Sequence, residues 1–428
     1  MQYKQSIDWL YSFKKHGSKL GLKRISYLLE RLHNPEKNIT IIHVTGTNGK
    51  GSVCKYIGSI LQKAGYRVGV YISPHLQRFS ERMVINDAEI SENEIVFLIE
   101  KVKPVVEEMI ADNKPPTFFE IVTAMAFLFF SDSSVDFAVV EVGLGGRFDA
   151  TNVVLPAVSV ITNISLEHTD RLGEDVSSIA FEKAGIIKDH VPVVTAVNNE
   201  AKPVIQRIAQ EKNAPIILVE KENWKRLSHN LNYQEFCING LLNDYTVKTS
   251  MLGSYQGENI ALAVFVAEQL KLKGVYVADR DIIDGVSLAF NPGRMEIIGK
   301  NPTVLLDGAH NPFGMQMLAK TLKEDFFYKR LILIVGILKD KNIDHMLSVI
   351  APLSDVFIAT KSHNDRACEP NDLKERMAKL GYSKELFVEQ SLKKAIDRAL
   401  SIAQTQDLIC ISGSLFTVGE ARTYRKKP

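Results

Sequence analysis

Residues 41–52, which read IIHVTGTNGKGS, constrain the fold more than any other part of the chain. The apolar run at 39–44 predicts a buried strand, and this run breaks into a glycine-rich turn that contains Lys50. Apolar residues then recur at helical spacing from 53 to 64. A strand, a glycine loop and a helix in this order form the context that a phosphate-binding P-loop requires.

The residue types in this loop suit the phosphates of a nucleotide. Glycines let backbone N–H groups surround a phosphate, and a helix that begins near Lys50 adds unsatisfied N–H groups and the positive end of its dipole. In the common pattern Ser or Thr follows the lysine directly, whereas Gly51 precedes Ser52 here. A plain glycine turn between a strand and a helix is the alternative. The candidate ATP contacts are Thr47, Asn48, Gly49, Lys50, Gly51 and Ser52.

Length and composition limit the classes of protein to which the chain can belong. A chain of 428 residues is too long for one ordinary core, so we expect two domains. The net charge of +2 does not favour nucleic-acid or membrane binding, and the four cysteines lack metal-site spacing. The apolar stretch 118–130 is too short to span a bilayer, and residues 1–15 have no signal core. We expect a cytoplasmic enzyme.

Polar residues lie at the ends of the next three predicted strands, where open α/β sheets bind their ligands. Ser73 follows the second strand, and its hydroxyl can bind a hard cation or simply mark a turn. Glu141 lies in an apolar strand, where a carboxylate is costly unless it is paired or binds a metal, and its place near the P-loop suits a Walker-B-like acid. His168 follows the fourth strand, although imidazole is not a favoured magnesium ligand.

Three further segments carry weaker signals. Thr117 and Glu120 have the spacing of a capping box before a strongly apolar helix. Residues 203–250 read as short strands and turns that form an antiparallel extension of the first sheet. The basic residues near the N-terminus read as a solvated helix face, and they are Lys14, Lys15, Lys19, Lys23 and Arg24.

The last third of the chain predicts a separate α/β domain. Pro292 and Gly293 fit a linker, and Arg294 is either a linker charge or a bidentate grip on a phosphate. Strands then alternate with helical stretches, which predicts a doubly wound, Rossmann-like parallel sheet, although the usual dinucleotide motif does not follow its first strand. We therefore expect a P-loop domain over 1–294 and a second α/β domain over 295–428, with strands at 303–306, 331–335, 356–359 and 408–411.

Seven stretches resemble the Mur ligase family, in the order in which that family has them. The likeness is closest to the folate branch of the family, the folylpolyglutamate and dihydrofolate synthases. It implies a P-loop ATPase domain followed by a glutamate-ligase domain. The stretches are residues 45–52, 73–82, 141–152, 161–170, 182–186, 292–295 and 306–312.

This resemblance implies an activity, the ATP-dependent addition of L-glutamate to a folate through an acyl phosphate, with release of ADP and phosphate. It implies that Ser73, Glu141 and His168 hold magnesium, with two ions in the site. It also implies that Lys183 is carbamylated by carbon dioxide to N6-carboxylysine. Carbamylation turns a cation into an anion, and it needs a neutral amine, which burial favours.

The resemblance also implies where the substrates bind. Asn259 is the implied ATP contact in the helix that begins near residue 255, and Gln256 is the competing amide. Arg294 and Asp307 are further implied nucleotide contacts, and His310 is expected near the incoming amino acid. The implied folate contacts are Pro74, His75, Arg82, Thr117, Phe118, Phe119, Glu120, Phe148, Asp149 and Ala150.

Two other functions fit parts of the pattern. A Mur-type ligase that acts on a cell-wall precursor would share the P-loop, but the stretches 73–76 and 143–152 argue against it. A non-catalytic nucleotide-sensing protein would keep Lys50 and would need neither Glu141 nor Lys183. We expect a monomer whose partners are ATP, L-glutamate and an acceptor. Dihydropteroate, the glutamate tail of a folate, or both remain open as acceptors.

Overall fold

The chain divides into two compact units. The computed structural model describes residues 2–17 and 21–425. Because two short segments before residue 290 group with the second unit, the expected division after residue 294 stays a prediction. The first unit comprises Met1–Lys225, Phe236–Lys248 and Gly257–Ala289, and the second unit comprises Arg226–Glu235, Thr249–Gln256 and Phe290–Pro428.

An eight-stranded sheet forms the centre of the first unit, in the order β4-β3-β2-β5-β1-β6-β7-β8. Neighbouring strands from β2 to β8 are parallel, whereas β3 and β4 add an antiparallel edge. The strands are β1 (Thr40–Thr45), β2 (Val68–Tyr71), β3 (Met83–Ile85), β4 (Ala88–Glu89), β5 (Phe137–Glu141), β6 (Val158–Ile161), β7 (Val193–Thr195) and β8 (Ile216–Leu218).

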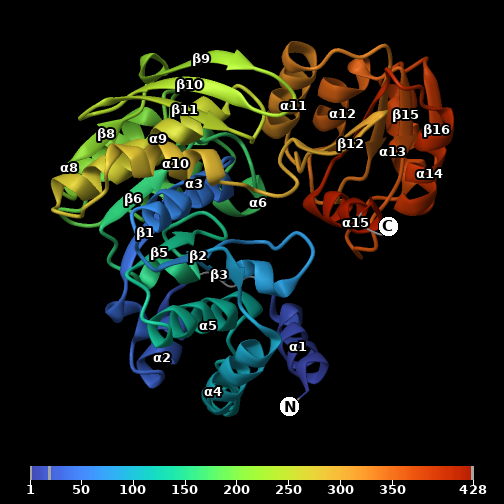
Figure 1. The fold of residues 1–428 in the computed structure, drawn as a ribbon. Helices are drawn as coiled ribbons and strands as arrows, with labels where there is room; N and C mark the ends of the chain where they lie inside the picture. The colour runs from blue at the N-terminus through green and yellow to red at the C-terminus, as the bar shows by residue number, and fades with distance from the viewer. Residues whose placement is uncertain (1, 18–20, 426–428) are drawn as a thin grey trace. The chain divides into compact units, whose positions relative to one another are not determined.

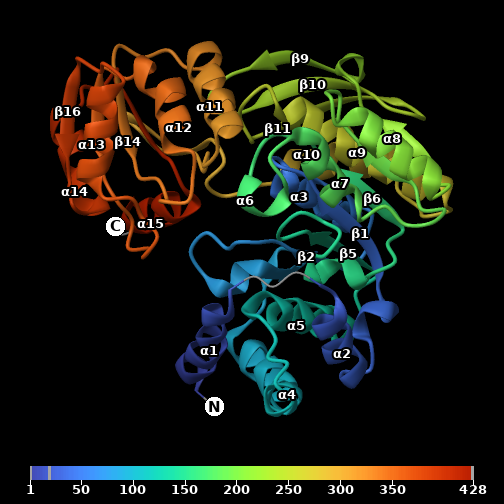
Figure 2. The same cartoon turned by 180° about the vertical axis from the view of Figure 1, so that it is seen from behind.

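Helices cover both faces of this sheet, which explains why its parallel strands are apolar along nearly their whole length. Helices α4 and α5 lie on one face, and α3 and α10 pack together on the other (Figure 1, Figure 2). The helices from α1 to α10 are Tyr3–Ser12, Lys23–Arg31, Lys50–Lys63, Glu92–Ala111, Phe118–Asp132, Thr169–Leu172, Val176–Ala184, Lys202–Glu211, Gln256–Leu272 and Asp279–Leu288.

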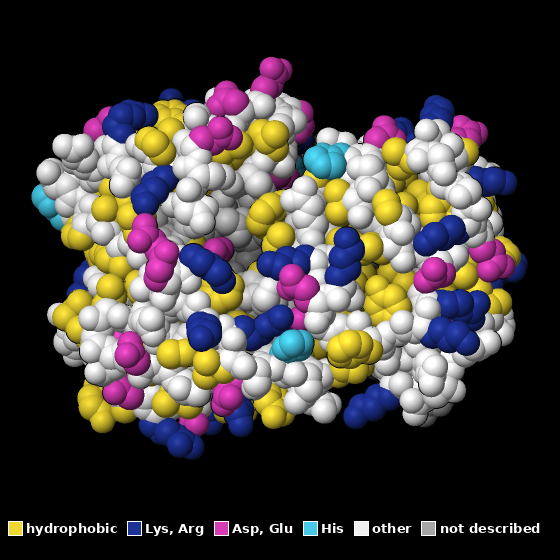
Figure 3. Space-filling model, turned by 90° about the horizontal axis from the view of Figure 1, so that it is seen from above, with side chains coloured by type: hydrophobic (Ala, Val, Ile, Leu, Met, Phe, Trp, Pro, Cys, Tyr) yellow, Lys and Arg dark blue, Asp and Glu magenta, His cyan; other side chains and the backbone are white. Residues whose placement is uncertain are grey.

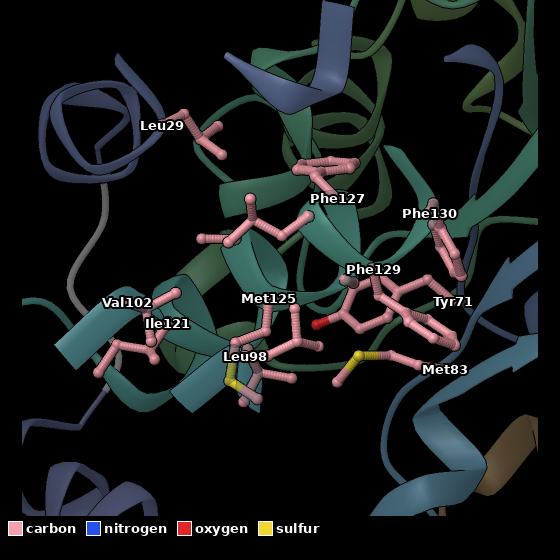
Figure 4. Close-up of a cluster of buried hydrophobic side chains, with 14 of the residues drawn as sticks. Leu29, Tyr71, Met83, Leu98, Val102, Ile121, Met125, Phe127, Phe129 and Phe130 are labelled. Carbon is pink, nitrogen blue, oxygen red and sulfur yellow. The ribbon is translucent and has the colours of Figure 1, made fainter. Parts of the chain in front are cut away.

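A hydrophobic core of the first unit includes residues of the sheet and of α1, α2, α4 and α5. Phe129 and Phe130 of α5 gather there with Tyr71 of β2 and Met83 of β3 (Figure 4). Among the residues described, no helix has the length and apolarity that crossing a bilayer requires.

A six-stranded sheet forms the second unit, in the order β12-β13-β17-β14-β15-β16. Only β12 is antiparallel to its neighbour, so the predicted doubly wound parallel sheet is confirmed, while β12 and β16 were not predicted. The strands from β12 to β17 are Glu296–Lys300, Thr303–Leu306, Leu331–Val335, Val356–Ala359, Glu385–Val388 and Leu408–Ser412, and the helices from α11 to α15 are Pro312–Asp325, Ile343–Ile350, Pro370–Lys379, Leu392–Ile402 and Leu415–Arg425.

Residues 203–250 differ from the expected run of short strands. Helix α8 occupies the first part, because Pro203 fits the first turn of a helix and Ile205, Ile208 and Ala209 form one buried face. Strand β8 then joins the main sheet in parallel. The remaining strands form a separate three-stranded sheet in the order β11-β10-β9 rather than an extension of the first, and they are Trp224–His229 (β9), Gln234–Asn239 (β10) and Asp244–Thr249 (β11).

Candidate active site

The predicted P-loop connects β1 to α3 in the first unit. Lys50 is the first residue of α3, and its Nζ donates hydrogen bonds to the carbonyl oxygens of Gly46 (3.0 Å) and Thr47 (3.1 Å). The ammonium group is thus held by the loop's own backbone. A phosphate would offer it a charged acceptor, which makes a stronger hydrogen bond than a carbonyl does.

Two glycines of the loop have no room for a side chain. A Cβ atom on Gly46, whose φ is +147°, would lie 1.8 Å from Oγ1 of Thr162. A Cβ atom on Gly49, whose φ is +85°, would lie 2.5 Å from Oδ1 of Asn259. Glycine adopts such φ values without the strain that other residues meet. The close fit places Asn259, a predicted ATP contact of α9, beside the predicted contacts of the loop.

Glu141 and Ser73 meet at the carboxyl ends of neighbouring strands. Glu141 ends β5 with 5% of its surface exposed, and its Oε2 accepts a hydrogen bond from the backbone N–H of Ser73, 3.1 Å away. Strand β2, which precedes Ser73, pairs with β5 in parallel, so both residues reach the same edge. The pair suits Mg²⁺, which is commonly held by one or two carboxylates together with phosphate oxygens and water.

The third predicted metal ligand, His168, is the N-cap residue of the short helix α6 and has a left-handed conformation with φ +53°. Its Nε2 lies 3.8 Å from Oε1 of Glu167. Within 2–17 and 21–425, no group of three or more His, Cys, Asp and Glu side chains could hold a metal ion. The magnesium role of His168 therefore stays a prediction.

Lys183 of α7 is buried, with 5% of its surface exposed, and it reaches the P-loop. Its Nζ donates to the carbonyl oxygen of Gly46 at 2.8 Å, the same oxygen that accepts from Lys50. Burial, and then the charge of Lys50, lower the pKa of Lys183 to about 7. A neutral amine, the form that reacts with carbon dioxide, is therefore accessible near neutral pH.

The glycine loop at 143–152 packs against α7 beside Lys183. The backbone N–H of Arg147 donates to the carbonyl oxygen of Glu182 at 2.7 Å. A Cβ atom on Gly146 would lie 2.7 Å from the carbonyl oxygen of Lys183. Such close backbone approach requires glycine at position 146, whereas Cβ atoms on Gly143 and Gly145 would meet the side chains of Phe119 and Leu172.

The predicted folate contacts of this loop face different ways. Asp149 is buried and turns into the loop, where its Oδ2 accepts a hydrogen bond from the backbone N–H of Leu144 at 2.9 Å. Ala150 is buried as well, whereas Phe148 is partly exposed beneath the guanidinium group of Arg147, 4.3 Å from its ring centroid. Asp149 thus supports the loop, and of these three side chains Phe148 is the exposed one.

A second group of predicted folate contacts surrounds Arg82, which is 7% exposed. Its Nε donates to Nδ1 of His75 at 2.8 Å, and its guanidinium group lies 5.6 Å from the ring centroid of Phe118. Burial and then the charge of Arg82 lower the pKa of His75 to about 3, so this imidazole is neutral. Nearby, the ring of Phe119 leaves no space for a Cβ atom on Gly143.

Thr117 and Glu120 form the capping box that their spacing predicted. The backbone N–H of Glu120 donates to Oγ1 of Thr117, and the backbone N–H of Thr117 donates to Glu120 at 2.7 Å. Nε of Arg24 also donates to this buried carboxylate at 3.1 Å. The solvated-face interpretation is therefore wrong for Arg24, because α2 turns it toward a buried carboxylate, while Lys23 is exposed as expected.

Lys14 is exposed, as the solvated-face interpretation expected, and it also lies over aromatic rings. Its ammonium group lies 4.0 Å from the ring centroid of Tyr11 and 5.6 Å from that of Phe118. A cation over an aromatic ring is attracted by the ring quadrupole. Lys19 and the side chain of Lys15 lie outside the described part of the chain, and Pro74 is exposed.

Three predicted residues converge on Gly308 in the second unit. Asp307 follows β13, is buried, and accepts hydrogen bonds from two backbone N–H groups, at 2.9 and 3.1 Å. The carbonyl oxygen of Gly308 accepts from Nη1 of Arg294 at 3.1 Å and from Nδ1 of His310 at 2.9 Å. Burial raises the pKa of Asp307, and the charge of Arg294 opposes that shift. Because a carbonyl only accepts, Nδ1 of His310 carries a proton.

Comparison with known proteins names the family. The Mur ligase middle domain matches residues 44–267, and the Mur ligase glutamate ligase domain matches residues 293–415. The chain belongs to the Mur ligase family. The dihydrofolate synthase/folylpolyglutamate synthase of Bacillus subtilis is 36% identical, over 98% of this chain and 98% of that protein.

Solved structures agree with this membership of the Mur ligase family. Mycobacterium tuberculosis folylpolyglutamate synthase complexed with ADP superposes with a TM-score of 0.92 at 31% identity, covering 100% of this chain and 99% of that one. Escherichia coli FolC in complex with DHPP and ADP superposes with a TM-score of 0.85 at 31% identity, covering 98% and 97%. Both matches extend over the P-loop unit and the glutamate-ligase unit of the chain.

The sequence did not predict one residue that supports the P-loop of this Mur ligase. Asn163 is the second residue after β6. Its Oδ1 accepts from the backbone N–H of Asn48 at 3.0 Å, and its carbonyl oxygen accepts from the N–H of Thr47 at 2.7 Å. Thr162 adds a hydrogen bond to the carbonyl oxygen of Asn48 at 2.6 Å. The available signal was the position of two polar residues at the carboxyl end of a central strand.

Proposed function

We propose that this chain is an ATP-dependent ligase that joins L-glutamate to a folate and releases ADP and phosphate. The curated relatives that match its whole length are named dihydrofolate synthase/folylpolyglutamate synthase. The observation that carries the proposal is the carbonyl oxygen of Gly46, on which Lys50 and the buried Lys183 converge. A nucleotide sensor needs the first lysine, whereas only a ligase of this family has a use for the second.

The reaction requires that a carboxylate be activated and then attacked by an amine. An oxygen of the acceptor carboxylate attacks the γ-phosphorus of ATP, the bond to the ADP oxygen breaks, and an acyl phosphate forms. The glutamate amine attacks the acyl carbon, and the tetrahedral intermediate expels phosphate. Lys50 stabilises the charge on the transferred phosphoryl oxygens. With its proton on Nδ1, His310 presents Nε2 as the acceptor for the amine proton.

Magnesium fits the donors at the edge of the first sheet. Ser73 and Glu141 would hold the ion together with oxygens of the nucleotide, and His168 would hold a second one. When bound, Mg²⁺ offsets part of the phosphate charge. The Ser73 N–H that already binds Glu141 keeps the carboxylate pointed at this edge.

The substrate contacts follow from the same arrangement. We infer that a folate ring lies against Phe118 and Phe119, and that Arg82 binds an anionic group of the acceptor, because none of the described carboxylates forms an ion pair with this buried guanidinium. On the second unit, Arg294 and Asp307 would contact the nucleotide. Carbamylation of Lys183 would replace one of two facing cations by an anion.

A panel of acceptors tests the proposed function. Phosphate release from ATP is measured with L-glutamate and, in turn, dihydropteroate, tetrahydrofolate and a UDP-muramyl substrate. We expect release that depends on one or both pterin acceptors. Dependence on the UDP-muramyl substrate alone would establish a cell-wall ligase, and indifference to every acceptor would establish a nucleotide-sensing protein.

We also propose that the chain acts as a monomer. Basic and acidic side chains are interspersed on the face shown in Figure 3, as the net charge of +2 suggests. Sedimentation at several concentrations should give the mass of one chain, with or without ATP. A concentration-dependent mass would contradict this.

A further inference from the structure

A buried chain of three polar side chains connects β1 to the glycine loop of the first unit. His43 of β1 is fully buried, and its Nε2 lies 2.8 Å from Oγ1 of Thr151. The Thr151 hydroxyl in turn donates to Oδ1 of Asp149 at 2.6 Å, and its backbone N–H donates to the same oxygen at 3.0 Å. All three side chains are buried, so water does not replace these contacts.

The chain of hydrogen bonds fixes the tautomer of His43. A hydroxyl has one proton, and that of Thr151 goes to Asp149, so Thr151 must accept from His43. Nε2 of His43 therefore carries the proton, and Nδ1 carries a lone pair. Among the described atoms, Nδ1 has no hydrogen-bond partner, which agrees with a neutral ring whose only polar contact is Thr151.

Asp149 passes this orientation on to the loop. Its Oδ2 accepts from the N–H of Leu144, near the start of the loop, and its Oδ1 accepts from Thr151, near the end. The carboxylate thus bridges the two ends of the segment that presents Phe148. The P-loop that follows His43 has a further support in Asn163, and Oγ1 of Thr45 links the two loops through a hydrogen bond to the carbonyl oxygen of Gly145 at 2.7 Å.

We propose that His43 is a positioning residue for the acceptor, which acts through Thr151 and Asp149 to hold the loop at 143–152 in its binding conformation. The proposal rests on the proposed function for the identity of the acceptor, but its structural part does not. His43 touches neither substrate. A misplacement of about 1 Å at a site that orients reactants costs up to about 100-fold in rate, so a distant support of this kind is measurable.

Matched variants separate positioning from simple core packing. His43→Leu and Thr151→Val each break the chain of hydrogen bonds, whereas His43→Gln and Thr151→Ser keep a donor and a hydroxyl in place. Ile41→Val, two residues earlier on the same face of β1, is the control for core packing. We expect His43→Leu and Thr151→Val to raise the KM for the pterin acceptor by about 10- to 100-fold and the KM for ATP much less. His43→Gln and Thr151→Ser should recover most of this rise.

Two readouts do not depend on ligase activity. Nitrogen NMR of the histidine side chains should show His43 protonated at Nε2 in the parent and not uniformly so in Thr151→Val. Amide exchange of residues 143–152 should speed up in His43→Leu and not in Ile41→Val. Protonation at Nδ1 in the parent, or equal changes in both KM values, would overturn the proposal. If no acceptor supports turnover, the proposed function fails, and the NMR and exchange results still decide the role of His43.

Discussion

At the scale of single residues, the site is built around two lysines that donate hydrogen bonds to the same carbonyl oxygen. Nζ of Lys50 and Nζ of Lys183 lie 3.0 and 2.8 Å from the carbonyl oxygen of Gly46. Burial, and then the charge of Lys50, lower the pKa of Lys183 and so disfavour its charged form. The pair is therefore poised to lose one positive charge, either by loss of a proton or by carbamylation.

The lowered pKa of Lys183 predicts how activity depends on pH and carbon dioxide. The neutral amine, which forms the carbamate, becomes abundant as pH rises through about 7, far below the ordinary range of lysine. Bicarbonate added to a depleted sample should therefore raise the rate, and more strongly at about pH 8 than at about pH 6. The rate of phosphate release and the intact mass of the protein measure the effect.

Lys183→Arg is the matched control, since a guanidinium stays charged and cannot form the carbamate. This variant should be slow with or without bicarbonate. An active parent that carries an unmodified amine, and that bicarbonate leaves unchanged at both pH values, would show that the carbamate has no part in the reaction.

At the scale of elements, the glycines of the P-loop let the chain turn from β1 into α3 and leave room for Asn259 beside the loop. Gly49→Ala should destabilise the fold by about 1–2 kcal/mol, because a Cβ atom meets both an unfavourable φ and Oδ1 of Asn259. Gly65→Ala is the control, since its φ of +91° is similar and nothing lies within 4 Å of the added atom. Thermal unfolding and ATP titration should show that both variants lose stability and that only Gly49→Ala also loses ATP affinity. Equal ATP affinity in the two would contradict the role of Asn259.

Local sequence patterns predicted the elements that carry the site. They did not predict contacts between segments that are far apart in the sequence. The P-loop, the strand that contains Glu141 and the capping box at Thr117 are encoded within a few residues of sequence, so spacing and residue type suffice. Arg24 lies 96 positions from Glu120, and no local pattern reports such a pair. The Asn163 support of the P-loop belongs to the same class.

The strands at residues 224–249 show a related limit. Alternating burial is clear in β11, and the sequence predicted strands there. Whether such strands join an existing sheet or form their own depends on which edges are already covered. Strand β8 pairs with β7, and β9 to β11 pair among themselves, which spacing along the chain does not determine.

At the scale of the whole molecule, the proposed ATP contacts belong to two compact units. Lys50 and Asn259 lie in the first unit, whereas Arg294 and Asp307 lie in the second. We predict that one nucleotide contacts both sets of residues, which would restrict the relative motion of the units and help exclude water from the acyl phosphate. Binding and protection should then depend on the intact chain.

Small-angle scattering of the full chain tests this dependence. An ATP analogue together with a folate should lower the radius of gyration, because contacts on both units then share one ligand. Asp307→Ala, which removes a proposed contact of the second unit, should reduce the change. A radius that is the same with and without both ligands would contradict shared binding.

The most direct test is the rate at which the Lys50→Ala protein joins glutamate to a pterin acceptor, compared with the parent and with Lys63→Ala, an exposed position on the same helix. We predict a loss of about 10²- to 10³-fold or more for Lys50→Ala, since the transferred phosphoryl group loses its cation, and little change for Lys63→Ala. A Lys50→Ala protein that works as fast as its parent would contradict the assignment of this loop, and with it the proposed function.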